Sequence, residues 1–194
     1  MIRRAERKSM PGKANGAAAP TKEQMLEIGF EHATLFDPAQ LNFRQDVRDM
    51  CAADKCNYYN KCWVCPPACE DINKSVEKAK KYTRALMIQT TRQLEDSFDI
   101  ENMLDAADSH KKRFAQAVEL MRAYDPDCLP MGAGGCSLCR KCAYPDEPCR
   151  FPDKAFTSME AYGLYVAAEC KKAGLEYNYG PNTLTYSSCI LFND

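Results

Sequence analysis

Apolar and polar residues recur along the chain in blocks that predict a succession of helices and strands. Residues 21–28 are typical of a short helix, since Thr21 and Gln24 can form a capping box at its start. The segment "FEHATLF" (30–36) has the alternation of a half-buried strand. Residues 41–50 follow neither period, so we expect them to be extended or a loop.

The middle of the chain carries the strongest patterns. A helix is predicted over 71–81, and "RALMIQTT" (84–91) is a short β-branched run typical of a buried strand. Residues 100–123 form the clearest helix. Its expected apolar stripe consists of Ile100, Met103, Leu104, Ala107, Phe114, Ala117, Val118 and Met121.

Two more strands and one more helix are expected towards the C-terminus. "CLPMGAGG" (128–135) predicts a strand that runs into a glycine turn, and 183–192 has the period of two of a last strand. Between them, Thr157 and Glu160 predict a capping box that opens a helix ending at Gly174. The order of elements predicts an α/β (or α+β) fold: one layered domain over 21–194, with a sheet of about four strands, helices packed on it and two cysteine-rich loops.

Composition and charge narrow the classes of protein. The 194 residues are 45% apolar, which is enough for a core, and a net charge of −1 argues against a nucleic-acid binder. Residues 1–20 carry five basic residues against one acidic, and we expect a disordered basic arm there. No apolar run reaches the roughly 18 residues of a membrane span, and no secretory h-region is present, so the cytoplasm is the expected compartment.

Twelve cysteines are the outlying number, and nine of them fall into two groups. In a reducing compartment such clusters indicate metal rather than disulfides. The second group is Cys136-x2-Cys139-x2-Cys142 with Cys149 six residues beyond the third cysteine. Three thiols at an interval of three are typical of [4Fe–4S] clusters, which take a fourth cysteine from further on, although the ferredoxin run has that cysteine closer.

Zinc is the main alternative, but structural zinc sites pair two separate knuckles, and here the middle cysteine would belong to both. The glycines that precede the triplet, Gly132, Gly134 and Gly135, either let backbone N–H groups approach a cluster or form a plain tight turn. Four basic residues surround the group and could offset cluster charge, dock an acidic redox partner or simply be solvated: Arg140, Lys141, Arg150 and Lys154.

The first group, "CAADKCNYYNKCWVCPPAC", contains Cys51, Cys56, Cys62, Cys65 and Cys69. Its spacings match no named pattern, and five thiols exceed the four that one cluster needs. Cys51, Cys56 and Cys65 are the best candidates, with Cys62 as the fourth ligand and Cys69 as its alternative. Zinc at this group stays open, as does an exchange of Cys65 and Cys149 between two clusters. Three aromatic residues of this loop could shield a cluster or belong to the core: Tyr58, Tyr59 and Trp63.

Isolated candidates have simpler interpretations. Cys128, Cys170 and Cys189 are expected to be buried small hydrophobic residues. His32 and His110 are expected to be structural rather than metal ligands. The sequence contains no recognisable catalytic triad, carboxylate pair or nucleotide fingerprint, so an enzymatic activity is neither predicted nor excluded.

Three segments together resemble an uncharacterised prokaryotic family of predicted cysteine-rich metal-binding proteins: "CNYYNKCWVCPP", "MGAGGCSLCRKCAYPDEPCRFPDKAFTSMEAYG" and "GPNTLTYSSCILF". The similarity runs discontinuously from about Arg48 to the C-terminus and is specific over 132–163. It implies metal binding, with Cys62 and Cys69 as additions in this member. The ligands that it implies are Cys51, Cys56, Cys65, Cys136, Cys139, Cys142 and Cys149.

The expected function is an iron–sulfur protein with two [4Fe–4S] clusters that transfers electrons to a redox partner protein. The alternative is a zinc-binding structural module or a metal carrier without redox activity. Neither the oligomeric state nor a substrate follows from the sequence.

Overall fold

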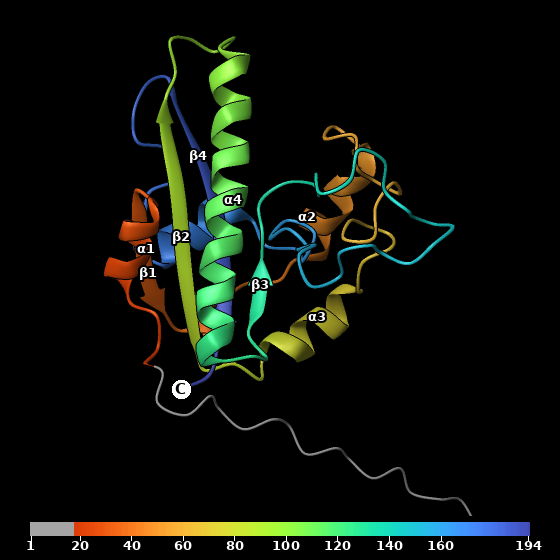
Figure 1. Ribbon diagram of the computed structural model, residues 1–194, viewed down its shortest axis with the longest axis horizontal. Coiled ribbons are helices and arrows are strands. Elements are labelled where there is room, and N and C mark those ends of the chain that lie inside the picture. Colours follow the sequence, from red (N-terminus) through yellow and green to blue (C-terminus); the bar gives the residue numbers. More distant parts are fainter. Residues whose placement is uncertain (1–17) are drawn as a thin grey trace, which may run out of the picture.

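The structure is a computed structural model and describes residues 18–194 (Figure 1). Its centre is a four-stranded sheet of order β1-β2-β4-β3 in which every neighbouring pair is antiparallel. This confirms the mixed fold with a sheet of four strands, in its α+β form. The strands are β1 (His32–Phe36), β2 (Arg84–Gln93), β3 (Leu129–Met131) and β4 (Thr183–Phe192); the helices are α1 (Lys22–Ile28), α2 (Gln45–Asp49), α3 (Ile72–Ala79), α4 (Ile100–Tyr124) and α5 (Val166–Lys172), with 3-10 turns η1 (Pro38–Gln40) and η2 (Met50–Ala53).

Both faces of the sheet are buried, and the period of two in the strands decides which residue faces which layer. In β2, Leu86 and Ile88 lie in the core under α1 and α4, whereas Ala85 and Met87 lie in the core on the opposite face. That second layer includes residues from α3, α5 and the chain between β3 and α5. The near-continuous apolar runs of the two long strands follow from this double burial.

Helix α4 forms where a helix was predicted, but different residues are buried in its N-terminal half. Its C-terminal half packs through the expected residues, including Phe114 and Met121. In the N-terminal half, however, Ala106 and His110 are buried, while Ile100 and Leu104 are more than 60% exposed. The buried positions therefore follow one helical face that passes through a polar histidine, which an apolar pattern does not detect.

His110 is a structural histidine, as expected. Its ring nitrogens lie 2.9 Å from Thr90 Oγ1 and 2.8 Å from Ser188 Oγ, in the layer between α4 and the sheet. Burial lowers the pKa of His110 to about 3, with smaller effects from the nearby Arg113 and Lys111 charges. The imidazole is therefore neutral in the folded protein over a pH range in which it is protonated in the unfolded chain.

This burial predicts acid sensitivity. Because the folded pKa lies below the unfolded value of about 6.5, the unfolded state binds more protons between these values. The free energy of unfolding is then expected to fall as the pH drops from about 6.5 to about 3, by up to about 1.4 kcal/mol per pH unit from this residue. Denaturant unfolding of the wild type and of His110→Gln at several pH values checks this. Parallel pH profiles for the two proteins would contradict it.

The helix predicted to begin near Thr157 begins only at Val166. Instead of capping a helix, the Thr157 carbonyl accepts the N–H of Gly132, 2.9 Å away, and the chain pairs with the end of β3. Gly163 then holds a positive φ of 86° and accepts the Arg44 N–H at 2.8 Å. Pairing with other segments therefore overrides the local helical signal here. Helix α2 likewise forms in the segment that was expected to be extended or a loop.

The capping box at Thr21 is formed as predicted. The predicted arm of residues 1–20 lies almost entirely outside the described residues. Within residues 18–194, no helix combines the length and the apolar character that crossing a membrane requires.

Candidate metal centre

The two cysteine-rich loops lie together beyond β3, at the end of the sheet opposite β1 (Figure 1). One runs from η2 to α3 and the other from β3 to α5. Trp63 Nε1 donates to the Glu147 carbonyl at 2.9 Å, and Tyr144 Oη donates to Asn60 Oδ1 at 2.7 Å. The Trp63 and Tyr144 rings also pack edge to face, 4.9 Å apart. Although far apart in sequence, the loops thus form one structural unit.

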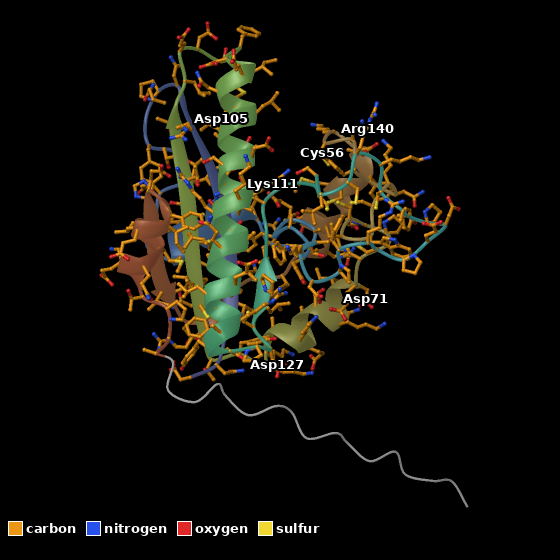
Figure 2. The ribbon with its side chains drawn as sticks, in the orientation of Figure 1. Cys56, Asp71, Asp105, Lys111, Asp127 and Arg140 are labelled. Atoms are coloured by element: carbon orange, nitrogen blue, oxygen red, sulfur yellow. The ribbon has the colours of Figure 1, made fainter. Side chains whose placement is uncertain are left out.

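Five thiols line one cavity of about 500 Å³ between these loops, which we call the thiol cavity. Four come from the second cysteine group, and the fifth is Cys62 from the first group. No carboxylate lines the thiol cavity, whereas Lys61, Arg140, Lys141 and Arg150 do. Arg140 lies on this unit in Figure 2, away from the sheet. Sulfur donors and positive charge therefore gather at the same place. The cysteines of the cavity are Cys62, Cys136, Cys139, Cys142 and Cys149.

Several neighbouring groups favour the thiolate of Cys62, which the sequence did not predict. The side chain of Cys65 is the largest cause that lowers the pKa of Cys62 to about 6, against the effect of burial, and the backbone of Val64, Cys136 and Cys65 lowers it further. Cys62 and burial together raise the pKa of Cys65. The backbone at Cys136, just after the glycines, therefore lies near the Cys62 sulfur.

Two glycines are required by this geometry. Gly134 has a positive φ of 65°. A Cβ placed on Gly135 would lie only 2.3 Å from ring carbons of Tyr58, which lines the thiol cavity from the other loop. Close approach of the two loops thus depends on the absence of a side chain at Gly135. The interpretation of "GAGG" as a simple turn is incomplete, because the turn also seats Tyr58.

The remaining thiols of the first group form a second set. Cys56 and Cys69 lie close enough to Cys51 for their charges to contribute to its raised pKa, whose main cause is burial. They affect Cys65 in the same way. Cys51 and Cys56 line a separate pocket of about 370 Å³, and Cys56 is exposed (Figure 2). We call Cys51, Cys56, Cys65 and Cys69 the second set, because none of them lines the thiol cavity, whereas Cys62 does.

Arg48 places a buried positive charge beside this second set. Its guanidinium donates to the carbonyl of Ala161 and, at 3.2 and 3.4 Å, to the carbonyl and the Sγ of Cys69. Arg48 is 9% exposed, and no carboxylate among residues 18–194 pairs with it. An uncompensated buried cation is unfavourable unless anionic groups lie near it. Thiolates held by a metal would supply that negative charge.

Arg48 would tune the reduction potential of any cluster that the second set held. Replacing Arg48 by Met would remove positive charge next to the thiolates, so the reduction potential of such a cluster should become more negative. Arg48→Lys, which keeps the charge, should move the potential less. Potentiometric titration of the three proteins checks the order wild type, Lys variant, Met variant. A Met variant with the wild-type potential would contradict it.

The candidate metal donors of this region are thiols, and they are not arranged around one point. Among the described residues, no group of three or more His, Cys, Asp or Glu side chains converges as the ligands of a single metal ion would. The thiols of the second group instead surround a cavity. Clusters take thiolates at separated corners, and hydrogen bonds to sulfur tune them. Thiols and nearby cations together make up the lining of the cavity.

The isolated cysteines are structural, as predicted. Cys170 and Cys189 are fully buried, and Cys128 is 7% exposed within the core under α4. Sequence reasoning missed Arg48, which lies in the segment without a clear period, and missed that Cys62 faces the other loop. His32 stacks on Tyr179 in the sheet region, away from both sets of thiols.

Comparison with known proteins agrees with metal binding. The sequence profile of a family described as "Predicted metal-binding protein (DUF2284)" matches residues 34–192, which include both cysteine groups. No curated protein and no solved structure matched the chain.

Proposed function

The chain belongs to this family of predicted metal-binding proteins, and from that premise we propose that it carries two [4Fe–4S] clusters and transfers electrons. The observation that carries the proposal is the thiol cavity, in which the Cys-x2-Cys-x2-Cys run and a fourth cysteine surround a volume rather than a point. A bound cluster would supply one-electron redox chemistry.

We assign one cluster to the thiol cavity and the other to the second set. Both assignments follow from which thiols lie together. Cys69 is preferred to Cys62 as the fourth ligand of the second set because it lies near Cys51 and contacts Arg48. The proposed ligands are Cys136, Cys139, Cys142 and Cys149 in the cavity, and Cys51, Cys56, Cys65 and Cys69 in the second set.

The residues around the thiol cavity cover it and give its rim a positive charge. Tyr58 covers the cavity, and the Trp63 contact holds the two loops together, which limits water access. Arg140 and Lys141 give the rim a positive charge that suits an acidic redox partner. We propose that electrons leave or enter through this rim.

Anaerobic purification followed by visible spectroscopy tests the proposal. We expect a brown protein with broad visible absorption that dithionite bleaches and oxidant restores. A colourless protein that binds zinc at the same cysteines would support the alternative function, a zinc module or metal carrier, and would contradict an electron-transfer role.

A further inference from the structure

Cys62 is the one thiol of the cavity that the proposed clusters leave without a role. It forms a Cys-x2-Cys pair with Cys65, in the segment Cys62-Trp63-Val64-Cys65. The Cys65 N–H donates to the Cys62 carbonyl at 3.3 Å, so a tight turn brings the two residues together. The Cys65 side chain is also near enough to be the largest cause that lowers the pKa of Cys62.

The two sulfurs differ in access. Cys62 lines the thiol cavity, whereas Cys65 is among neither the residues of that cavity nor those of the pocket at Cys51 and Cys56. Of these two residues, a small molecule that enters the cavity therefore meets Cys62 and not Cys65. A volume of about 500 Å³ lies in the range of small-molecule pockets.

The charged side chains that line the cavity determine whether it favours an anionic or a cationic molecule. Its charged side chains are all basic, and neither Arg140 nor Lys141 forms an ion pair with any of residues 18–194. Lys61 and Arg150 are partly neutralised by Asp54 and Glu147, at 2.7 and 3.9 Å. The cavity therefore favours an anion over a cation.

From these observations we infer that Cys62 and Cys65 form a thiol–disulfide exchange centre for small anionic disulfides, of which oxidised glutathione is a suitable probe. This inference rests on the proposed function at one point only: Cys65 is also a proposed cluster ligand. The cavity admits either a disulfide or a cluster, so exchange competes with metal loading.

The reaction balances in two steps. The Cys62 thiolate attacks one sulfur of the disulfide, the S–S bond breaks, and one thiolate leaves with the electron pair. Cys65 then passes its proton to the thiolate that has left and attacks the Cys62 sulfur of the mixed disulfide, which releases the second thiolate; that thiolate takes from water the proton that Cys62 gave up. The chain loses two electrons and gains a Cys62–Cys65 disulfide, and the probe is reduced to two thiols. Cys65 is thereby removed from the second set.

The test uses the full-length chain, stripped of metal with a chelator and reduced. We compare oxidised glutathione with cystamine, a cationic disulfide, at low salt, and map the products by peptide mass spectrometry. The expected product is the Cys62–Cys65 disulfide, formed about tenfold or more faster with oxidised glutathione. High salt should reduce this preference.

Three variants separate the steps. Cys65→Ser should retain one glutathione on Cys62, Cys62→Ser should form no disulfide at Cys65, and Cys128→Ser, in the distant core, should react as the wild type does. A disulfide between other cysteines, glutathione on Cys65 instead of Cys62, or equal rates with cystamine would overturn the inference.

Iron and sulfide analysis of the untreated protein distinguishes this inference from the proposed function. If the disulfide forms but the untreated protein holds no iron and no sulfide, the exchange centre stands and the clusters fail. If the clusters are present but the exchange does not occur, the proposed function stands and the exchange centre fails.

Discussion

The double substitution Cys139→Ser and Cys142→Ser is expected to remove about half of the iron and sulfide that the wild type binds. Both thiols line the thiol cavity, and a serine hydroxyl is a poor ligand for iron in such clusters. The second set, which is formed by other residues, should keep its cluster. Iron and sulfide content after anaerobic purification measures the loss.

Cys170→Ala is the matched control for this prediction. Cys170 is fully buried between α5 and the sheet, where its sulfur lies 3.4 Å from Ser187 Oγ. Its loss should lower stability but leave iron and sulfide at the wild-type level. An equal loss of iron in both proteins would indicate general unfolding, and full iron retention in the double variant would exclude a cluster at the cavity.

Gly135→Ala is expected to separate the two cysteine loops. The new methyl group would lie 2.3 Å from the ring of Tyr58, so either the ring or the glycine turn must move. Overpacking of this kind costs about 1–3 kcal/mol in the free energy of unfolding. Because the backbone of Cys136 lies near Cys62 and helps to lower its pKa, movement of the turn should also disturb that thiol. Denaturant unfolding and metal content measure the two effects.

A second substitution tests whether the clash is the cause. Tyr58→Ala should by itself remove the cover of the cavity. The double variant Tyr58→Ala, Gly135→Ala should lose less free energy of unfolding than the two single variants lose together. Additive losses would mean that Gly135 acts through its backbone conformation and not through its contact with Tyr58.

The two long strands were predictable because their residues are buried in a regular pattern along the chain. β2 and β4 are long, apolar and β-branched, and their register places Leu86 opposite Ile190 in the sheet. The capping box at Thr21 was predictable because both of its hydrogen bonds join residues only three positions apart, Thr21 and Gln24. At Thr157 the same type of signal failed, since the backbone there pairs with Gly132. Long-range pairing of this kind leaves no local trace in the sequence.

The sequence indicated which residue types form the candidate site, but not which cysteines line the thiol cavity and which belong to the second set. The triplet at Cys136 is a local pattern, because one short loop must place three thiols around one volume. Cys62 and Cys69 could not be separated by spacing, since the difference arises from contact between loops far apart in sequence. Arg48 escaped detection for the same reason: its partners, Ala161 and Cys69, come from both loops.

The iron, acid-labile sulfide and zinc contents of anaerobically purified protein show whether the chain holds two clusters. Two [4Fe–4S] clusters require about eight iron and about eight sulfide ions per chain, in equal amounts, with little zinc. A protein that holds stoichiometric zinc and no sulfide would contradict the assignment of clusters to this chain.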